Sequence, residues 1–435
     1  MNKDNTVLLC GAGREDITPE IGTCLYGYRP DIYSKAVHDS LFVTAAAFSD
    51  GADTFLLVTC DVCEIDCDLS DRILKETSLC CGIPEDRITV SAIHTHSAPN
   101  VAGLEGWGGI DEDYSLNIFL PAIKKASQKA LESMKKAAVG VSSVKSDVGM
   151  NRREITRQGR VILGQNPWGL YDPEMTVIAV KDEDGNGIIN LVHYGCHGTA
   201  AGENFEISRD WPGVMVDRLE KESGVMTAYW QGCCGDVGPR IPNGYTVGLG
   251  DIKYAEELGA VAGRDAVKAY KQIKSFEPKT VKVFSGKVSL PLDPLPDISE
   301  IEETLKAVKD PEKLINIDRL KYDHLVNVRD AVKNGVSFGN EFNFNVSIPV
   351  LGDIVFMPFP FEMFSETGLK LRRFAPYEHV LALSNSNGTY LYLPTRGEIL
   401  NGGYEVECFL YGHVFNFSSD AEICLVNEYL RIMGL

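Results

Sequence analysis

Short apolar runs separated by polar turns predict several buried strands in the first part of the chain. The runs at residues 7–10, 54–59 and 87–93 have the length and composition of strands. Residues 68–80, between the second and third runs, have the spacing of an amphipathic helix. This strand–helix–strand order predicts a parallel pair of strands joined by a right-handed crossover.

The first apolar run is followed by two glycines that indicate a tight turn. Gly11 and Gly13 resemble the start of a dinucleotide-binding fingerprint, but the third glycine of that motif is missing. Pro19, shortly afterwards, is incompatible with the helix that such a motif requires. We therefore expect a simple turn after the first strand.

The rest of the chain alternates between hairpins and helices. Alternating apolar segments joined by glycine turns predict two hairpins, and segments of helical spacing predict further helices. The hairpins cover residues 175–192 and 342–357, the helices 114–138, 211–222 and 297–334, and two further strands 226–230 and 379–384. Together these elements predict an α/β fold with mixed sheets, built from parallel strand–helix–strand units and added hairpins.

The length of 435 residues exceeds the usual size of a single hydrophobic core. No internal repeat, low-complexity tract or clear linker divides the chain. We therefore expect one α/β unit over residues 1–435, composed of two fused halves (1–275 and 276–435) that share a sheet system.

The composition is that of an ordinary globular protein, with 44% hydrophobic and 24% charged residues. A formal net charge of −19 opposes general binding to nucleic acids or to anionic membranes. No apolar stretch is long enough for a transmembrane span, and no secretory signal precedes the first strand. We expect a cytoplasmic protein without a nucleic-acid partner, and the sequence gives no indication of its oligomeric state.

The 12 cysteines do not have the spacing of a disulfide framework. Several stand inside apolar runs or as neighbours, such as Cys80 and Cys81. Cys60 and Cys63 form a single CxxC, whereas a zinc ribbon needs a second pair at similar spacing. We therefore expect reduced, buried thiols at these positions.

Two histidines follow the strand at residues 87–93 directly. His94 and His96 are two positions apart, so in extended backbone their side chains point to the same side. The chain has only 8 histidines, and neutral imidazole is the commonest metal ligand. A metal site at this strand end is the first hypothesis, and a pair of ordinary buried histidines is the alternative.

Two other strand ends carry further metal-binding side chains. His193 and His197 follow the predicted hairpin at 175–192, and Glu362 follows the second hairpin. A catalytic zinc site requires about three protein ligands of this kind and one open position. Ligands from distant strand ends are typical of a catalytic site built on a sheet.

Two more residues are predicted to lie near this site. Asp61 ends the strand at 54–59, which is expected to pair in parallel with the strand before His94, so both residues should lie at one sheet edge. Trp107 lies in a glycine-rich loop shortly after His96. It is expected either to cover the site as a lid or to pack on the surface.

These motifs together resemble the catalytic domain of the neutral/alkaline ceramidases, which are zinc-dependent N-acylsphingosine amidohydrolases. The resemblance extends over most of the chain and is most specific in the His-Thr-His-Ser and Gly-Asp-Val motifs. The matching segments are His94–Pro99, Asn151–Arg152, Cys196–Thr199, Gly235–Pro239, Pro360–Glu362 and Tyr392–Thr395. The family's carboxy-terminal immunoglobulin-like domain is not expected in this chain.

The resemblance implies a zinc ion held by His94, His197, Glu362 and Tyr392. Two neutral imidazoles and a carboxylate would leave positive charge on the ion. Such an ion lowers the pKa of bound water and polarises an amide carbonyl. The expected activity is therefore hydrolysis of an N-acyl amide by zinc-activated water, on a small or amphiphilic substrate.

The resemblance also implies supporting roles. Arg152 and Tyr404 would contact the amide or the polar head of the substrate, and His96 would be a nearby hydrogen-bond partner. Asp61, His96 and Asp236 are the candidates to orient ligands or to move a proton. Asp61 is also expected, like Trp107 and Gly238, to lie at the substrate site.

One departure from the family pattern bears directly on activity. The serine of the family's Gly-Asp-Val-Ser-Pro segment is replaced here by Gly238. If that serine is an obligate nucleophile, amide hydrolysis by its route is lost; if zinc-activated water attacks, hydrolysis survives. The alternatives to an amidohydrolase are a zinc-dependent esterase or other hydrolase of the same fold, and an inactive scaffold that binds a metal or a ligand.

Overall fold

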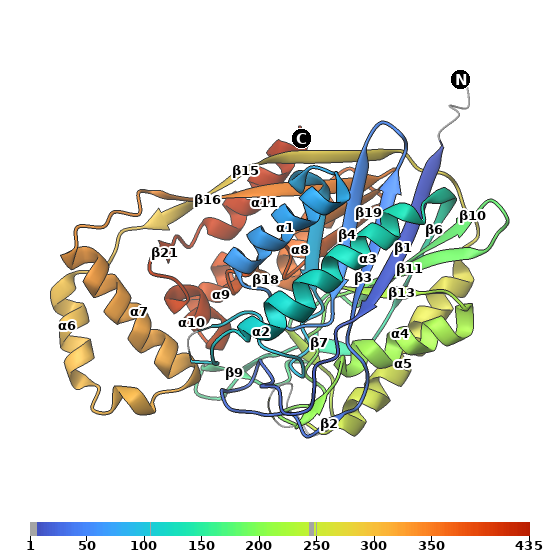
Figure 1. The fold of residues 1–435 in the computed structure, drawn as a ribbon. Helices are drawn as coiled ribbons and strands as arrows, with labels where there is room; N and C mark the ends of the chain where they lie inside the picture. The colour runs from blue at the N-terminus through green and yellow to red at the C-terminus, as the bar shows by residue number, and fades with distance from the viewer. Residues whose placement is uncertain (1–6, 105, 243–247, 249) are drawn as a thin grey trace.

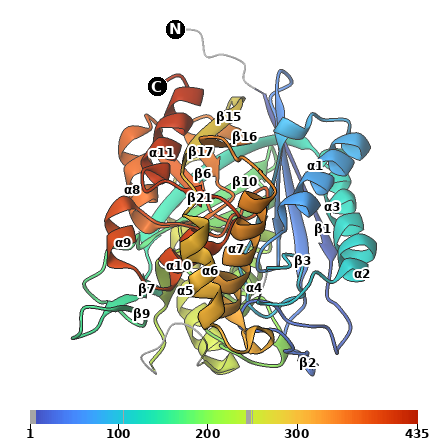
Figure 2. The same cartoon turned by 90° about the vertical axis from the view of Figure 1, so that its left-hand side faces the viewer.

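Two sheets packed face to face, with helices on both outer sides, form the body of the protein (Figures 1 and 2). The computed structural model describes residues 7–104, 106–242, 248 and 250–435. The larger sheet has eight strands and the smaller has five. The order of the layers is therefore helices, large sheet, small sheet, helices.

The large sheet is built from the first half of the chain. Its parallel pairs are β4–β5 and β11–β13, and its other neighbours are antiparallel. Across the sheet the strands are β13 (Thr227–Gln231), β11 (Gly187–Tyr194), β10 (Glu174–Asp182), β6 (Lys135–Lys145), β1 (Leu8–Asp16), β3 (Phe42–Ser49), β4 (Thr54–Cys60) and β5 (Ile88–Ala92).

Alternation along each strand gives this sheet two apolar faces. In β3, Ala45 and Ala47 pack toward the helices, whereas Ala46 and Phe48 pack toward the smaller sheet. The outer face is covered by four helices, which are α1 (Cys67–Cys81), α3 (Leu120–Glu132), α4 (Asp210–Ser223) and α5 (Ile252–Gln272).

The small sheet comes from the second half of the chain. Its order is β19 (His379–Leu383), β17 (Ile354–Pro358), β16 (Glu341–Leu351), β15 (Val281–Asp293) and β21 (Asn416–Phe417). One face packs on α8 (Ser365–Phe374) and α11 (Ala421–Ile432). The other face shares a core with the large sheet, in which Phe55 and Trp230 belong to the same apolar cluster as Phe356.

The remaining elements are short or lie at the periphery. The helices are α2 (Glu112–Tyr114), α6 (Ile298–Ala307), α7 (Asn316–Lys333), α9 (Arg396–Asn401) and α10 (Tyr404–Tyr411). The short strands are β2 (Ala36–Val37), β7 (Gly149–Asn151), β8 (Arg153–Ile155), β9 (Val161–Leu163), β12 (Glu206–Ile207), β14 (Val237–Pro239), β18 (Glu362–Met363) and β20 (Tyr392–Leu393). In Figure 1, α6 and α7 project from the body as a helical pair, and in Figure 2 they lie in front of it.

The predicted fold class is confirmed, because the sheets are mixed and contain both parallel strand–helix–strand units and hairpins. The turn predicted at Gly11 and Gly13 is wrong, since β1 continues to Asp16. These glycines are needed because α3 packs directly on the strand. A Cβ atom at Gly13 would lie 2.2 Å from the carbonyl oxygen of Ala126.

The long helix predicted at 114–138 is also different. It comprises α2, a π-helical turn (Ser115–Phe119) and α3, and it ends at Glu132. Residues from Lys135 onward form β6, because Ala137 and Val139 fill the core between the sheets. Tertiary packing here overrides a helical pattern of lysines and alanines.

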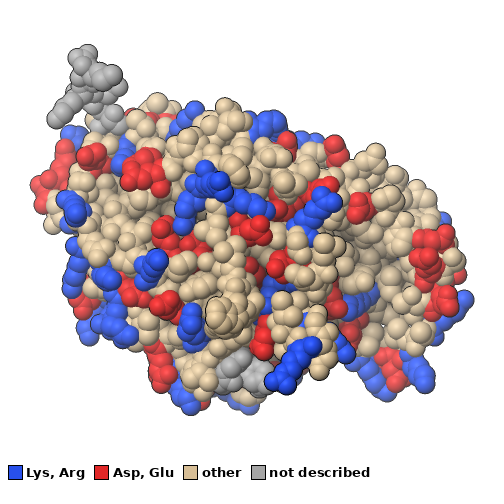
Figure 3. All heavy atoms as spheres, turned by 180° about the vertical axis from the view of Figure 1, so that it is seen from behind, with Lys and Arg blue, Asp and Glu red and all other residues tan. Residues whose placement is uncertain are grey.

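No helix among the described residues is long and apolar enough to cross a membrane. Figure 3 shows basic and acidic side chains interspersed over the face opposite to that of Figure 1. The net charge of −19 is therefore not gathered into one acidic patch on that face.

Candidate metal centre

Four side chains from separate parts of the chain meet at one buried point. His94 follows β5, His197 follows β11, and Glu362 and Tyr392 lie opposite each other in the parallel pair β18–β20. The Oε2 atom of Glu362 lies 3.2 Å from Nε2 of His94 and 3.0 Å from Nε2 of His197. The Tyr392 hydroxyl lies 3.4 Å from Nε2 of His197.

Both imidazoles are oriented by backbone carbonyl groups. Nδ1 of His94 lies 3.0 Å from the carbonyl oxygen of Cys63, and Nδ1 of His197 lies 2.9 Å from that of Cys234. A proton on Nδ1 leaves a lone pair on each Nε2, and these atoms face the carboxylate of Glu362. The hydrogen-bond pattern thus favours the tautomer that a metal ligand requires.

Two of these buried atoms have no hydrogen-bond partner in the described part of the chain. They are Nε2 of His94 and Oε2 of Glu362. An unpaired buried polar atom is costly, and a metal ion would remove that cost. Two imidazoles, a carboxylate and a phenol therefore fit a zinc ion in chemical type and in orientation.

Cys234 is a further potential ligand, which the sequence pattern did not single out. Its thiol belongs to the same group as His94, His197 and Glu362, in which the ligand atoms all lie within 4.8 Å of one another. Burial raises the pKa of this thiol to about 12. The adjacent residues Cys233 and Cys234, just before the Gly-Asp-Val motif, could have indicated a thiol near the site. Adjacent cysteines alone do not show which of the two thiols faces that site.

The backbone around His94 is strained in a way that serves the cluster. His94 has φ = 66°, in the left-handed region that non-glycine residues seldom adopt. The next residue, Thr95, forms a bridge with Gly198, beside His197. A Cβ atom at Gly198 would lie 2.8 Å from the carbonyl oxygen of His94, so a glycine allows the two ligand segments to touch.

Charge interactions within the cluster are strong because it is buried. Although burial opposes ionisation of Glu362, His94 and His197 hold the pKa of its carboxyl well below the ordinary value. Burial lowers the pKa of His197 to about 3, with further contributions from Arg152 and His94. His197 is therefore neutral at physiological pH, as a ligand must be.

Arg152 places a buried cation next to the cluster. Its guanidinium donates to the Tyr392 hydroxyl at 2.9 Å and to Glu405 at 2.8 Å. Glu405 also accepts from Arg153 at 2.7 Å and lies next to Tyr404, whose ring stands edge-on to that of Tyr392. Glu405 was not among the predicted residues, because its partners are more than 250 positions away in the sequence.

A small cavity of about 30 Å³ opens beside the cluster. Among its lining residues are His96, Trp107 and Tyr404, as predicted from the sequence. Both ring nitrogens of His96 lack a hydrogen-bond partner in the described structure, and burial with the neighbouring histidines keeps its pKa well below the ordinary value. His96 is thus a neutral imidazole with free polar atoms.

Glu64 is a second carboxyl group in this cavity, and sequence reasoning missed it. It accepts from the Tyr26 hydroxyl at 3.0 Å and from the Thr389 hydroxyl at 3.3 Å. Burial raises its pKa to about 7, and the charge of Glu362 adds to this effect. Asp61 and Glu64 both follow the carboxyl end of β4, but only Glu64 lines the cavity.

The comparisons with known proteins agree with this geometry. Residues 8–250 match the model of the family described as neutral/alkaline non-lysosomal ceramidase, N-terminal. The chain belongs to the neutral/alkaline ceramidase family. The predicted resemblance is thereby confirmed, and the family and the fold support a ceramidase-like hydrolase.

Solved ceramidases share the fold at low sequence identity. A crystal structure of neutral ceramidase from Pseudomonas aeruginosa has a TM-score of 0.75 and 17% identity, covering 99% of this chain and 74% of that one. A structure entitled "Ceramidase complexed with C2" has a TM-score of 0.74 and 16% identity, covering 98% and 75%. A comparison with curated proteins found no match.

Two residues expected near the site from their positions at strand ends lie outside the cavity. Asp61 accepts from the backbone N–H of Phe42 at 2.8 Å and lies 4.0 Å from Arg209, on the side of the sheet that faces the helices. His193 bonds the carbonyl oxygen of Ala382 at 2.9 Å. The structure brings neither residue to the cluster.

The Gly-Asp-Val-Gly segment of this ceramidase-family chain lies behind Arg152. Asp236 accepts from the backbone N–H of Ser365 at 2.7 Å, and its own carbonyl oxygen accepts from the N–H of Arg152 at 2.8 Å. Gly238 lies in β14 opposite Met150 of β7. Asp236 therefore positions the arginine segment, and no hydroxyl stands at position 238.

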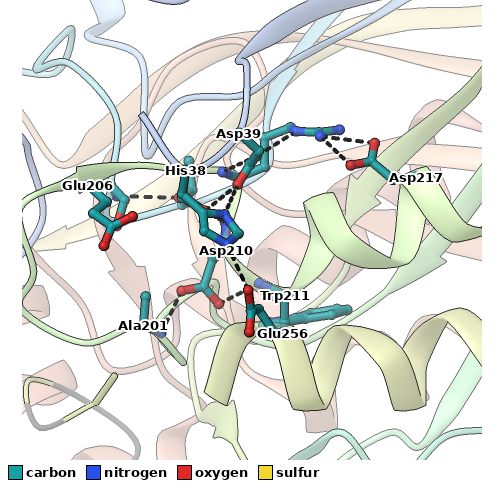
Figure 4. A network of polar contacts seen from close by, with 12 residues as sticks. His38, Asp39, Ala201, Glu206, Asp210, Trp211, Asp217 and Glu256 are labelled. Carbon is teal, nitrogen blue, oxygen red and sulfur yellow. Dashed lines mark hydrogen bonds and ion pairs between the residues drawn. The ribbon is translucent and has the colours of Figure 1, made fainter. Parts of the chain in front are cut away.

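The loop that carries His197 is held from behind by the start of α4. The Asp210 carboxylate accepts from the N–H groups of Ala200 and Ala201 at 3.0 and 2.8 Å (Figure 4). The Trp211 indole donates to the carbonyl oxygen of His197 at 2.8 Å. These bonds fix the backbone of a candidate metal ligand, and neither Asp210 nor Trp211 lines the cavity.

Proposed function

We propose that this chain is a zinc-dependent amidohydrolase that cleaves the amide bond of a small or amphiphilic N-acyl substrate. The observation that carries the proposal is that Nε2 of His94 and Nε2 of His197 both lie within 3.2 Å of Oε2 of Glu362. Two of these atoms have no hydrogen-bond partner among the described residues. A metal ion would give each of these buried atoms a partner, which supports a metal site.

Zinc would be held by His94, His197, Glu362 and Tyr392. When bound, the ion supplies Lewis-acid polarisation of a carbonyl group and a lowered pKa of bound water. The chain itself supplies a fixed cation, because Arg152 is only 1% exposed and donates to Tyr392. A guanidinium held in place stabilises the negative charge that develops on an amide oxygen during attack.

Proton transfer belongs to groups that line the cavity. Amide hydrolysis requires a base for the attacking water and an acid for the departing amine. His96 and Glu64 are available for this purpose, whereas Asp61 and Asp236 are held in contacts elsewhere. Glu64 is the better candidate, since a pKa of about 7 suits both the acceptance and the return of a proton.

The cavity limits the part of the substrate that reaches the cluster. The space for the centres of water-sized groups beside the cluster is only about 30 Å³. Trp107 and Leu104 form part of its wall, together with the Glu64 carboxyl group. We therefore propose that a short acyl group is preferred, and that the rest of an amphiphilic substrate remains outside.

Metal content and hydrolysis test the proposal together. Purified protein is expected to contain about one zinc per chain and to hydrolyse N-acyl amides until a chelator is added. His197→Ala should lose the zinc and the activity. His379→Gln is the matched control, because His379 belongs to a separate group with Asp353 and Glu378 near the surface. Zinc that remains in His197→Ala and disappears in His379→Gln would contradict the assignment.

The replacement of the family serine by Gly238 favours a second candidate, an inactive scaffold that binds zinc. An esterase of the same fold is the third. Equal panels of N-acyl amides and matched esters, from acetyl to long-chain acyl groups, separate the three. Amide cleavage supports the proposal, ester cleavage alone favours the esterase, and zinc binding without turnover favours the scaffold. Gly238→Ser should leave the zinc content unchanged in all three cases.

We also propose a cytoplasmic location. All 12 cysteines are free thiols, and most of them are buried. Cys80 and Cys81 approach within 3.6 Å between their sulfur atoms without a disulfide bond. This state suits a reducing compartment. Cell fractionation with an antibody against the chain would test the location.

A further inference from the structure

Cys234 brings a sulfur atom into the candidate metal centre. Its Sγ atom lies within 4.8 Å of one potential ligand atom from each of His94, His197 and Glu362, and all four side chains are buried. In the same group, Nε2 of His94 and Oε2 of Glu362 have no hydrogen-bond partner among the described residues. The proximity of the sulfur atom and the unpartnered polar atoms are separate observations that point to one metal position.

The backbone holds Cys234 against two of the proposed ligands. Its carbonyl oxygen accepts from Nδ1 of His197 at 2.9 Å. The N–H of the next residue, Gly235, donates to the carbonyl oxygen of Met363 at 2.8 Å, directly after Glu362. A Cβ atom at Gly235 would lie 2.6 Å from the carbonyl oxygen of Glu362, so a glycine permits this approach. Cys234 is therefore fixed by contacts to the segments that carry His197 and Glu362.

The adjacent cysteine, Cys233, lies in a different environment. Its side chain belongs to the apolar core formed by the small sheet and its helices. A Cβ atom at Gly368 of α8 would lie 2.9 Å from the sulfur atom of Cys233. Cys233 is thus a buried thiol one position from Cys234 that packs against a helix instead of joining the metal group.

Cys63 is the other thiol that approaches a histidine of the cluster. Its sulfur atom lies 3.6 Å from Nδ1 of His94, whereas Nε2 of that ring faces Glu362. Cys63 forms a separate potential group with His94 and His96, which does not include Glu362. It is therefore the rival thiol that a test has to distinguish from Cys234.

A serine hydroxyl supports the thiol of Cys234. Burial raises the pKa of this thiol, whereas His94 and a hydrogen bond with the Ser384 side chain lower it. The Ser384 hydroxyl accepts from the N–H of Met363 at 3.2 Å, so its own hydrogen is available for the sulfur atom. A hydroxyl that donates to sulfur stabilises a metal-bound thiolate.

We infer that Cys234 binds the metal ion as a thiolate, in addition to the ligands proposed above. Its proton is released to solvent when the ion binds. One carboxylate and one thiolate together balance the charge of a divalent ion, which favours the ion in a buried site. The inference rests on the proposed function only in requiring a metal ion at the cluster.

A sulfur ligand also affects which ion the site prefers. Thiolates favour zinc, whereas magnesium, calcium and manganese prefer carboxylate and carbonyl oxygens. We therefore expect bound zinc to remain in place during dialysis against an excess of magnesium or manganese. This preference is a property of the ligand set and is measured without any substrate.

X-ray absorption at the zinc edge gives a direct test on the unchanged protein. It should show a sulfur neighbour at about 2.3 Å beside nitrogen and oxygen neighbours at about 2.0–2.1 Å. Cobalt in place of zinc should give the near-ultraviolet charge-transfer absorption of a cobalt–thiolate bond. Neither measurement depends on whether a variant folds.

Variants of the three thiols identify the sulfur atom. Cys234→Ala should remove the sulfur neighbour and the charge-transfer band, and should weaken zinc binding by at least about tenfold. Cys233→Ala is the matched control, because its side chain lies in the apolar core, and it should retain both signals. Cys63→Ala should also retain them, since its sulfur atom lies beside Nδ1 of His94.

The outcomes separate this inference from the proposed function. Zinc bound without a sulfur neighbour would overturn the inference and leave the zinc hydrolase standing. Loss of the sulfur signals in Cys63→Ala, with their retention in Cys234→Ala, would overturn it as well. A purified protein that takes up neither zinc nor cobalt would overturn the inference and the proposed function together.

Discussion

Glu64 and Glu362 place two carboxyl groups in one buried cavity, which is unfavourable unless a proton or a cation lies between them. The pKa of Glu64 is raised to about 7, first by burial and then by Glu362. The folded protein therefore holds this proton more tightly than the unfolded chain. Its contribution to stability is present below pH 4.5 and is lost as the pH rises through about 7.

Glu64→Gln is accordingly expected to remove this pH dependence. We compare the free energy of unfolding of the metal-free variant with that of the unchanged metal-free protein. As the pH rises between these two values, this difference should shift in favour of the variant by up to roughly 3 kcal/mol. Urea unfolding in the presence of a chelator, below pH 4.5 and above pH 7, measures the difference. Glu303→Gln, at an exposed position of α6, serves as the control. A constant difference at all pH values would show that Glu64 has the same pKa in the folded and the unfolded protein.

Single residues at the centre were predictable where a local motif identified them. The two-residue spacing of His94 and His96, together with the family resemblance, pointed to a site that the structure does assemble with His197, Glu362 and Tyr392. The neighbours supplied by distant segments were not predictable. Cys234 and Glu405 reach the cluster only because of the way that β13 and α10 are packed.

At the scale of elements, helix α10 carries a residue that joins two arginines. Glu405 and Arg152 are each 1% exposed, and Arg153 is 3% exposed. Glu405→Ala would leave both guanidinium groups buried without their shared partner. We expect a loss of roughly 3–5 kcal/mol in the free energy of unfolding.

A loss of activity should accompany this change, because Arg152 would no longer be held against Tyr392. Removal of such a supporting bond typically lowers the activity by about 10- to 100-fold. Glu407→Ala on the same helix is the control, since Glu407 forms a surface pair with Lys321 worth less than about 1 kcal/mol. Urea unfolding and turnover of an N-acyl amide measure both effects. Equal losses in the two variants would contradict the assigned role.

The packing of α3 on β1 gives a second prediction at this scale. Gly13 was expected in a turn, but it lies in a strand where a Cβ atom would lie 2.2 Å from a backbone oxygen. Gly13→Ala should therefore destabilise the protein by about 1–3 kcal/mol, as measured by urea unfolding. Gly397→Ala is the control, because no atom lies within 4 Å of the added methyl group. The control should be neutral or slightly stabilising.

Elements were predictable where periodicity and burial agree. The hairpin β10–β11 and the parallel pair β4–β5 follow from alternation and from strand–helix–strand order. The pattern failed at β1 and β6, where the local sequence permits a turn or a helix. Both strands exist because the neighbouring sheet and helix bury them, and that information is not local.

At the scale of the whole molecule, the candidate zinc site joins the two halves of the chain. His94 and His197 come from residues 1–275, whereas Glu362 and Tyr392 come from residues 276–435. The halves also share the core in which Phe55, Trp230 and Phe356 pack together. We propose that they form one folding unit, in which zinc acts as a cross-link.

Unfolding should therefore be a single transition that depends on zinc. A ligand that binds only the folded state raises the free energy of unfolding by about 3 kcal/mol when its free concentration is about 100 times its dissociation constant. Chelation should lower the midpoint of thermal unfolding for the unchanged protein but not for His197→Ala. Hydrogen exchange should become faster in both β11 and β19, because losing the ion weakens the contact between the halves. If chelation accelerated exchange in one half only, or if heating gave two transitions, the halves would be independent domains and the ion a local ligand.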